Sequence, residues 1–277
     1  MDRRNFLKTG GIALLGSLAT GSAMALTTPG ALGGEGADKK AAVALAMNHF
    51  GVSEADLKKV LAAALEKGGD YADLFFEHTI SNSIRLMDGA VNNSYSNIDY
   101  GVGVRVLTGD QSGYAYVENI TVEDMLKAAR TAARIASANK GNKPLNLTEK
   151  ELKKNYYTVA SPWEEVSLKD KMPYLQKLND RIFALDKRVH KVQASQSDTT
   201  SHIFFCNSEG VMFYDYRPMV TLGAVCIMEE DGKTENGYAA RAYRRGFDFL
   251  SDEVVDVIAR EAVDQTSLLF KAIKPKG

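Results

Sequence analysis

The sequence is poor in several residues whose abundance would mark a protein class. Its 277 residues include two cysteines, six prolines and one tryptophan. Two cysteines are too few for a disulfide-stabilised scaffold, and the low proline content together with 45% hydrophobic residues excludes a disordered or collagen-like chain. The formal net charge is only -1, which gives no electrostatic basis for binding nucleic acid. No apolar stretch reaches the roughly 18 residues that a membrane helix needs, so no stable membrane anchor is expected.

The N-terminus has the pattern of an export signal. Arg3 and Arg4 precede a mildly apolar stretch over residues 10–19, and small residues follow up to Ala25. This order is typical of a cleaved signal peptide, and the arginine pair resembles the twin-arginine signal. We therefore expect a twin-arginine-type signal peptide over residues 1–25 and a protein that works in the periplasm or elsewhere outside the cytoplasm. A basic, frayed helical N-terminus is the alternative.

Residues 26–52 are expected to form a linker with a short helix. After them the sequence changes from helical to strand periodicity. Ser53 is placed to cap a helix that Gly68 and Gly69 end. Alternating residues over 74–86 and 100–106 predict strands, and residues 114–117 predict a return strand. Thr121 then caps a helix. We assign residues 53–138 to a first module.

A second module with the same order of elements is expected after a linker over residues 139–162. A helix runs from Ser167 to about residue 187, and Ser251 caps a closing helix. The strands predicted between these helices cover residues 190–197, 203–207, 211–216, 220–228 and 237–243. The fold class is therefore α+β, with two consecutive modules of antiparallel sheet flanked by helices over residues 53–138 and 163–277.

Motifs that carry chemistry are missing from the sequence. It contains no phosphate-binding loop, no nucleophile elbow, no H-E-x-x-H and no C-x-x-C. The candidate metal ligands are His49, His78, His190, His202, Cys206 and Cys226. His202 and Cys206 share one strand face but lie about 13 Å apart at 3.3 Å per residue, too far to bind one zinc ion. No catalytic residue and no metal site are assigned.

A disulfide between Cys206 and Cys226 is not expected either. In a simple meander of these strands the two residues lie on strands separated by a third, which exceeds the separation that a disulfide tolerates. Arg241, Arg244 and Arg245 lie among aromatic residues, and a solvated strand end is the favoured interpretation of that cluster.

An ordered series of segments resembles the TldD/PmbA family, and its TldD branch in particular. In the first module these are residues 69–77, 97–105, 112–116 and 128–133; in the second they are residues 186–189, 192–195, 215–218, 229–233 and 245–249. The resemblance implies a zinc metallopeptidase that works as a dimer and cleaves extended or unfolded peptides. It also implies that the zinc ligands, an H-E-x-x-x-H pair and a cysteine, lie in a third, C-terminal module that this sequence does not contain.

The resemblance leads to two hypotheses of function. In the first, the chain is the substrate-handling and dimerisation portion of an exported TldD-like zinc metallopeptidase, inactive alone, with zinc bound only in the complete family member. In the second, it is a non-catalytic regulatory partner of a complete TldD/PmbA paralogue. A homodimer and a heterodimer are both open. Gly101, Gly103 and Arg105 are the predicted peptide-binding residues, because small residues on one strand face let another backbone approach. Close packing of this face against a helix is the alternative.

Overall fold

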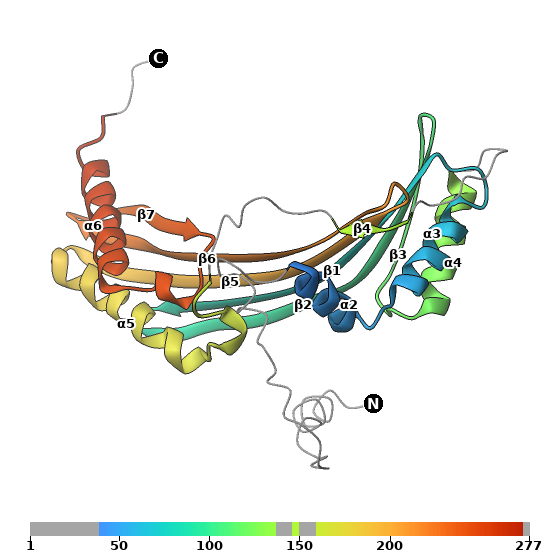
Figure 1. Ribbon diagram of the computed structural model, residues 1–277. Coiled ribbons are helices and arrows are strands. Elements are labelled where there is room, and N and C mark those ends of the chain that lie inside the picture. The colour runs from blue at the N-terminus through green and yellow to red at the C-terminus, as the bar shows by residue number, and fades with distance from the viewer. Residues whose placement is uncertain (1–38, 137–145, 150–158, 274–277) are drawn as a thin grey trace, which may run out of the picture.

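The computed structural model describes residues 39–136, 146–149 and 159–273, in which five α-helices flank one seven-stranded sheet (Figure 1). The first half comprises α2 (Lys39–Phe50), α3 (Glu54–Leu65), β1 (Tyr71–Met87), β2 (Ala90–Thr108), β3 (Gln111–Val117) and α4 (Val122–Ile135). The second half comprises β4 (Thr148–Glu149), the short 3-10 helix η2 (Trp163–Glu165), α5 (Leu168–Leu185), β5 (Val189–Asn207), β6 (Val211–Glu230), β7 (Lys233–Tyr243), the short 3-10 helix η3 (Phe247–Phe249) and α6 (Asp252–Leu269). No helix of these described ranges is long and apolar enough to cross a membrane. Arg3 and Arg4 lie outside them.

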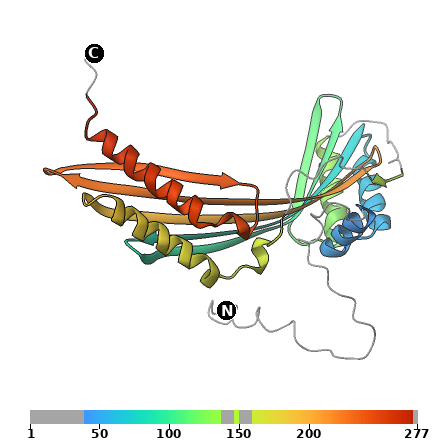
Figure 2. The ribbon, with the colours of Figure 1, turned by 60° about the vertical axis from the view of Figure 1, so that its left-hand side comes forward.

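The predicted α+β class is confirmed, and the strands of both halves join in one curved sheet. The strand order is β3-β2-β1-β5-β6-β4, with β7 also paired to β6. All of these pairs are antiparallel except the short β4–β6 pair. The join between the halves is the long β1–β5 pair, so the two sequence modules share a single sheet (Figures 1 and 2).

The prediction of four short strands over residues 190–228 was wrong. The structure has two strands there, β5 with 19 residues and β6 with 20. The physical reason lies in the middle of β5, where Gln196, Asp198 and Thr200 are buried although they are polar. Their side chains interrupt the apolar alternation on which strand prediction rests, while the backbone pairing continues.

Two apolar cores lie on the same face of this sheet, one toward each end. Phe204 and Cys206 of β5 belong to the core beneath α2, α3 and α4. Val192 and Ala194 of the same strand belong to the core beneath α5 and α6. All four positions are even-numbered, and side chains of a strand alternate between faces, so both cores occupy one face. We call the opposite side, on which no described helix packs, the open face.

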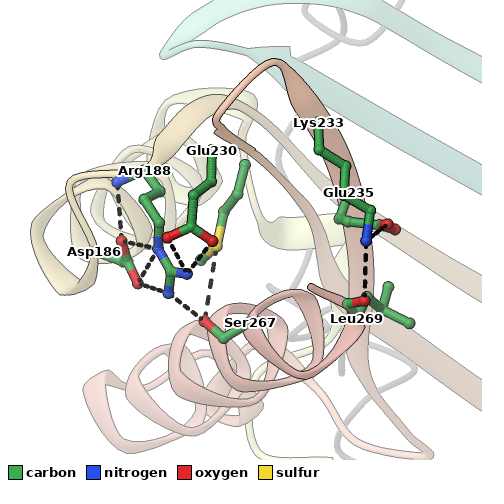
Figure 3. Close-up of polar contacts among 8 residues, drawn as sticks. Asp186, Arg188, Glu230, Lys233, Glu235, Ser267 and Leu269 are labelled. Atoms are coloured by element: carbon green, nitrogen blue, oxygen red, sulfur yellow. Dashed lines mark hydrogen bonds and ion pairs between the residues drawn. The ribbon is translucent and has the colours of Figure 1, made fainter. Parts of the chain in front are cut away.

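Side-chain caps and ion pairs fix the helices at their ends. The predicted cap at Ser53 is confirmed, because its hydroxyl accepts from the Asp56 amide and the Asp56 carboxylate accepts from the Ser53 amide. At the far end of the sheet Arg188 donates to Asp186 at 2.7 Å, to Glu230 at 3.2 Å and to Ser267 of α6 at 3.1 Å (Figure 3). Lys233 also reaches the Leu269 carbonyl (Figure 3). These contacts fasten the last turns of α6 to the β6–β7 hairpin.

Candidate functional site

The predicted peptide-binding residues lie together on the open face of β2. Gly101, Gly103 and Arg105 are alternate residues of the strand, and the Arg105 guanidinium donates to Asp73 of β1 at 2.9 Å. A Cβ atom added at Gly103 would lie 2.5 Å from the Tyr114 hydroxyl, and one added at Gly101 would lie 2.5 Å from the Val117 carbonyl oxygen. The glycines therefore let β3 approach β2.

Backbone pairing separates β2 into two parts with different accessibility. From Val102 to Thr108 the strand is paired with β1 on one side and with β3 on the other. From Ala90 to Gly101 it is paired with β1, and in the described structure no strand borders its other side. We call residues 90–100 the free edge; every one of them is exposed. An added strand would pair with the free edge, because both sides of Gly103 are already occupied.

The direction of the backbone groups at the free edge follows from the register. The Ser208 amide donates to the Ala72 carbonyl, so even-numbered residues of β1 pair through hydrogen bonds with β5. The odd-numbered residues of β1 then bond to the odd-numbered residues of β2. The amides and carbonyls of Ser94, Ser96, Ile98 and Tyr100 consequently point outward, away from β1.

The free edge lacks the features that usually protect an edge strand. It contains no proline and no lysine, and Asp99 is its single charged residue. Three of its apolar side chains are strongly exposed, Val91 at 53%, Tyr95 at 58% and Ile98 at 61%. An unprotected edge of this length with apolar side chains is typical of a surface that pairs with another strand.

Small hydroxyl side chains cover the middle of the open face beside the free edge. They come from β1, β5 and β6 and are Thr79, Ser81, Ser83, Ser195, Ser197, Thr199, Ser201 and Thr221. Thr79 donates to Ser201 at 2.8 Å, and the hydroxyls of Ser81 and Thr199 are 3.3 Å apart. These short hydroxyl side chains thus bond to one another across the strands.

On the helix side, between the two cores, three histidine rings stack on one another; we call them the histidine stack. His49 closes α2, while His78 of β1 and His202 of β5 face each other across the sheet pairing. The ring centre of His49 lies 5.0 Å from that of His78 and 4.8 Å from that of His202. His49 Nε2 and His78 Nδ1 are 2.8 Å apart, so one ring donates a hydrogen bond to the other.

Hydrogen bonds from neighbouring groups set the tautomer of His202. Its Nε2 lies 3.1 Å from Glu164 Oε1 and its Nδ1 lies 2.7 Å from the Tyr214 hydroxyl. Burial raises the pKa of Glu164, but the bonds from His202, the backbone and Tyr216 outweigh it and lower the net pKa, so Glu164 is ionised at neutral pH. Burial raises the pKa of Tyr214, which stays neutral. In its neutral form His202 therefore donates from Nε2 to Glu164 and accepts the Tyr214 proton at Nδ1.

The same geometry limits the chemistry that the histidine stack performs. His202 is only 3% exposed, so its Glu–His–Tyr array does not meet a substrate. The three rings lie roughly parallel, and within the described ranges no group of three or more His, Cys, Asp or Glu side chains is arranged to hold a metal ion. Zinc therefore does not fit these residues.

The remaining candidates of the sequence lie apart from one another. Cys206 and Cys226 are free and buried, and burial followed by Asp73 raises the pKa of the Cys206 thiol. They lie on neighbouring strands, not on strands separated by a third as expected, but their partners Met212 and Val192 show that they are far apart along the pair. His190 lies exposed near the start of β5. Arg241 pairs with Glu261 and Arg245 with Asp248, which accounts for two arginines of the cluster.

Sequence reasoning missed both the free edge and the histidine stack. The alternation in residues 74–86 placed His78 and Ile80 on one face, and a pairing of β1 with β5 would have brought His78 opposite His202. That pairing joins residues more than 100 positions apart, for which a single sequence gives no signal. His49 was assigned to a short helix, with nothing to show where the helix docks.

Comparisons with known proteins agree with this architecture. Residues 72–136 match the model of the PmbA/TldA metallopeptidase domain 1, and residues 161–270 match that of the PmbA/TldA metallopeptidase central domain. The chain is 31% identical over 214 residues to a metalloprotease TldD homologue of Haemophilus influenzae, covering 74% of this chain and 44% of that protein. It is 26% identical over 219 residues to a metalloprotease of Methanocaldococcus jannaschii, covering 76% of this chain and 47% of that protein. The chain thus spans less than half the length of these relatives.

Solved structures show the same fold at lower identity. A Thermotoga maritima protein described as a modulator of a DNA gyrase superposes with a TM-score of 0.63 at 19% identity, over 81% of this chain and 50% of that one. TldE from Thermococcus kodakarensis gives a TM-score of 0.57 at 17% identity, over 76% of this chain and 47% of that one. The two matching domain models together cover more than half of the sequence, in the order that the fold requires. The chain belongs to the PmbA/TldD metallopeptidase family, of which it carries the first and the central domain.

Proposed function

We propose that this chain is the substrate-handling and dimerisation portion of an exported TldD-like zinc metallopeptidase that acts on extended or unfolded peptides. The relatives carry the name metalloprotease, and their additional length leaves room for a catalytic module outside this chain. The described residues do not fit zinc, so the hydrolytic step is assigned to that module and the present chain to binding.

The observation that carries the proposal is the free edge. An extended peptide has an unpaired row of amides and carbonyls, and it can bond to the outward groups of Ser94, Ser96, Ile98 and Tyr100 whatever its sequence. Its side chains alternate, so one half of them would lie on the open face beside Tyr95 and the hydroxyl side chains. A folded protein, whose backbone groups are already paired, would not bind in this way.

In this proposal Gly101, Gly103 and Arg105 lie directly beyond the free edge and contact the side chains of the peptide. The free edge stops where Val117, the last residue of β3, pairs with Val102, and there the two glycines and Arg105 form the adjoining part of the open face. Tyr114 and Tyr116, 58% and 66% exposed, flank them from β3. Peptide side chains that extend past the free edge would contact these residues, not pair with their backbone.

The test removes one outward amide from the free edge. In Ser96→Pro the amide that points to solvent is lost while the bonds of β2 to β1 are kept, which is how proline is tolerated on an edge strand. Binding of a fluorescent, uncharged twelve-residue peptide to the full chain should weaken about tenfold or more in anisotropy titrations. Ser96→Ala, which keeps the amide, is the matched control and should bind like the unmodified chain. Equal affinity of the two variants would refute binding at the free edge.

A second candidate function is a regulatory partner of a complete TldD/PmbA paralogue. It is favoured by the same absence of a zinc-binding group among the described residues. The intact mass of the native product from the cell envelope separates the two. A mass well above 30.2 kDa supports a catalytic module on the same chain, and a mass slightly below it supports a separate partner.

Replacing Arg3 and Arg4 with lysine tests export, because a twin-arginine signal would then leave the protein in the cytoplasm. Sedimentation of the chain, alone and with a complete paralogue, distinguishes a homodimer from a heterodimer.

A further inference from the structure

The histidine stack joins an N-terminal helix to the sheet at a place where positive charge has almost no compensation. We propose that it is a pH-operated latch, which holds α2 on the sheet at neutral pH and releases it on acidification. The proposal concerns the helix side of the sheet and does not depend on peptide binding at the free edge.

Helix α2 has few other attachments. Val43, Ala46 and Phe50 enter the first core, and the Phe50 ring lies 5.5 Å from Phe76 and 5.9 Å from Tyr100. Immediately after the helix, Gly51 adopts a left-handed backbone with φ of 67°. The amides of Gly51 and Val52 cap the last turn of α2 by donating to Asn48 and Met47, so the helix ends here and the chain turns toward α3.

The bond between His49 and His78 depends on how many protons the two rings carry. With both rings neutral, one nitrogen donates and the other accepts across 2.8 Å. If one of the two rings takes up an additional proton, it becomes a cation that lies against the faces of the other rings. With two additional protons both facing nitrogens carry hydrogen, and the bond is lost.

Glu164 is the carboxylate that bonds to the histidine stack, and it does so through His202. Glu164 from η2 accepts from His202, Tyr216 and Thr200, and none of its bonds goes to His49 or His78. The other titratable groups in contact with these rings are Tyr100 of β2 and Tyr214 and Tyr216 of β6, and burial raises the pKa of all three hydroxyls, so they stay neutral. Asp198 of β5 also lies on the helix side, but its carboxylate is paired with Lys171. Glu77 and Asp215, on β1 and β6, are odd-numbered and lie on the open face. At most one ring cation is compensated.

The direction of the pH effect follows from His49. Burial, then His202 and His78, lower its pKa from 6.5 to about 4 in the docked helix, and burial first also lowers the pKa of His78. Above pH 6.5 the ring is neutral whether or not α2 is docked, so docking carries no protonation penalty. Between pH 6.5 and 4 the undocked ring takes up a proton that the docked ring does not, so docking weakens as the pH falls. One pKa unit corresponds to a factor of ten; because the ring is partly exposed, we expect about tenfold more undocked helix at pH 5 than at pH 7.

Hydrogen exchange of the full chain measures the undocked population directly. The amides of residues 42–50 should lose about tenfold protection between pH 7 and pH 5, after correction for the intrinsic exchange rate. The amides of α6 report global unfolding and should keep their protection. In His49→Gln, which can still donate or accept a hydrogen bond but does not titrate, the loss in α2 should largely disappear. His190→Gln is the matched control, because His190 is exposed and outside the histidine stack.

Three results would overturn the latch. They are unchanged protection of α2 in the unmodified chain, an equal loss in His49→Gln and in His190→Gln, and a loss of equal size in α2 and α6. Should His49→Gln already be undocked at pH 7, His49→Phe keeps the ring stacking without a titrating group and must show pH-independent protection. Failure of the peptide test with Ser96→Pro would leave all of these measurements unaffected.

Discussion

Removal of Lys171 from the interior should destabilise the protein more than removal of the whole ion pair to which it belongs. Lys171 of α5 and Asp198 of β5 are 4% and 1% exposed, and their charged groups are 2.5 Å apart. The Lys171 ammonium also lies 5.3 Å above the Trp163 ring. Asp198 accepts two further bonds, from Asn82 at 3.0 Å and from Gln196 at 2.9 Å. The pair thus connects α5 to the sheet between the two apolar cores.

The expected loss of unfolding free energy depends on which buried charge each variant leaves unpaired. In Lys171→Met the carboxylate of Asp198 stays buried with two amide donors and no counter-ion, which costs about 3–5 kcal/mol. Asp198→Asn leaves a buried ammonium and should cost a similar amount. In the double variant both charges are gone and the new amide still has hydrogen-bonding neighbours, so we expect a loss of about 1 kcal/mol. The coupling between the two positions is then several kcal/mol.

Urea unfolding provides the assay, followed by far-ultraviolet circular dichroism and by the fluorescence of Trp163, the only tryptophan. Each single variant should lower the midpoint by roughly 1–2 M, at a urea dependence of 2–3 kcal/mol per M. Independent contributions would instead add, with the double variant the least stable of the three. That outcome, or a cost below about 1 kcal/mol for Lys171→Met, would refute the reasoning.

Three further predictions concern single positions. Gly113→Ala should cost about 2–3 kcal/mol in urea unfolding, because its Cβ would lie 2.0 Å from the Ala132 carbonyl oxygen of α4; Gly109→Asn, in open space with φ of 53°, should cost under about 0.5 kcal/mol. Cys206 should not react with a thiol reagent at pH 8 in the folded protein and should react fully in urea, since burial raises its pKa; rapid labelling of the folded chain would contradict this. Arg188 lowers the pKa of Asp186, so it stabilises the fold above the ordinary pKa of an aspartate and this contribution is lost as the pH falls. Arg188→Met should therefore unfold more easily than the unmodified chain at pH 7 and differ less from it at pH 3.

Local signals in the sequence predicted most of the elements. The caps at Ser53, Thr121 and Ser251 correctly predicted where α3, α4 and α6 begin, because capping is a property of neighbouring residues. The open-face position of Gly101, Gly103 and Arg105 also follows from strand alternation alone. The α+β class required nothing beyond the order of these elements.

The features that depend on distant pairing could not be predicted in this way. Local patterns do not show that β1 pairs with β5. The single shared sheet, the histidine stack and the free edge could therefore not be predicted from them. Buried polar residues add a second difficulty, since Asp198 in a strand looks like a surface residue until Lys171 is known to reach it. Strand alternation thus predicted that Gly101, Gly103 and Arg105 share a face, while the part of β2 with an unpaired edge had to come from the structure; peptide binding at β2 stays a prediction.

The polar residues between the two cores offer a reason why this sheet has one register. β1, β5 and β6 run through both cores, where side chains such as Phe76, Phe204 and Val192 are simply apolar. A slip of two residues between β1 and β5 would keep every side chain on its face, so the cores alone discriminate poorly against it. It would, however, move Asn82 away from Asp198 and His78 away from His202, which now lie directly opposite each other. Asp198, which is 1% exposed, would lose the Asn82 amide as a hydrogen-bond donor, at a cost of about 1–3 kcal/mol, and His78 would lose its ring stacking on His202. The polar residues between the two cores, which made the strands hard to predict, are therefore the part of the sequence that specifies how the strands pair.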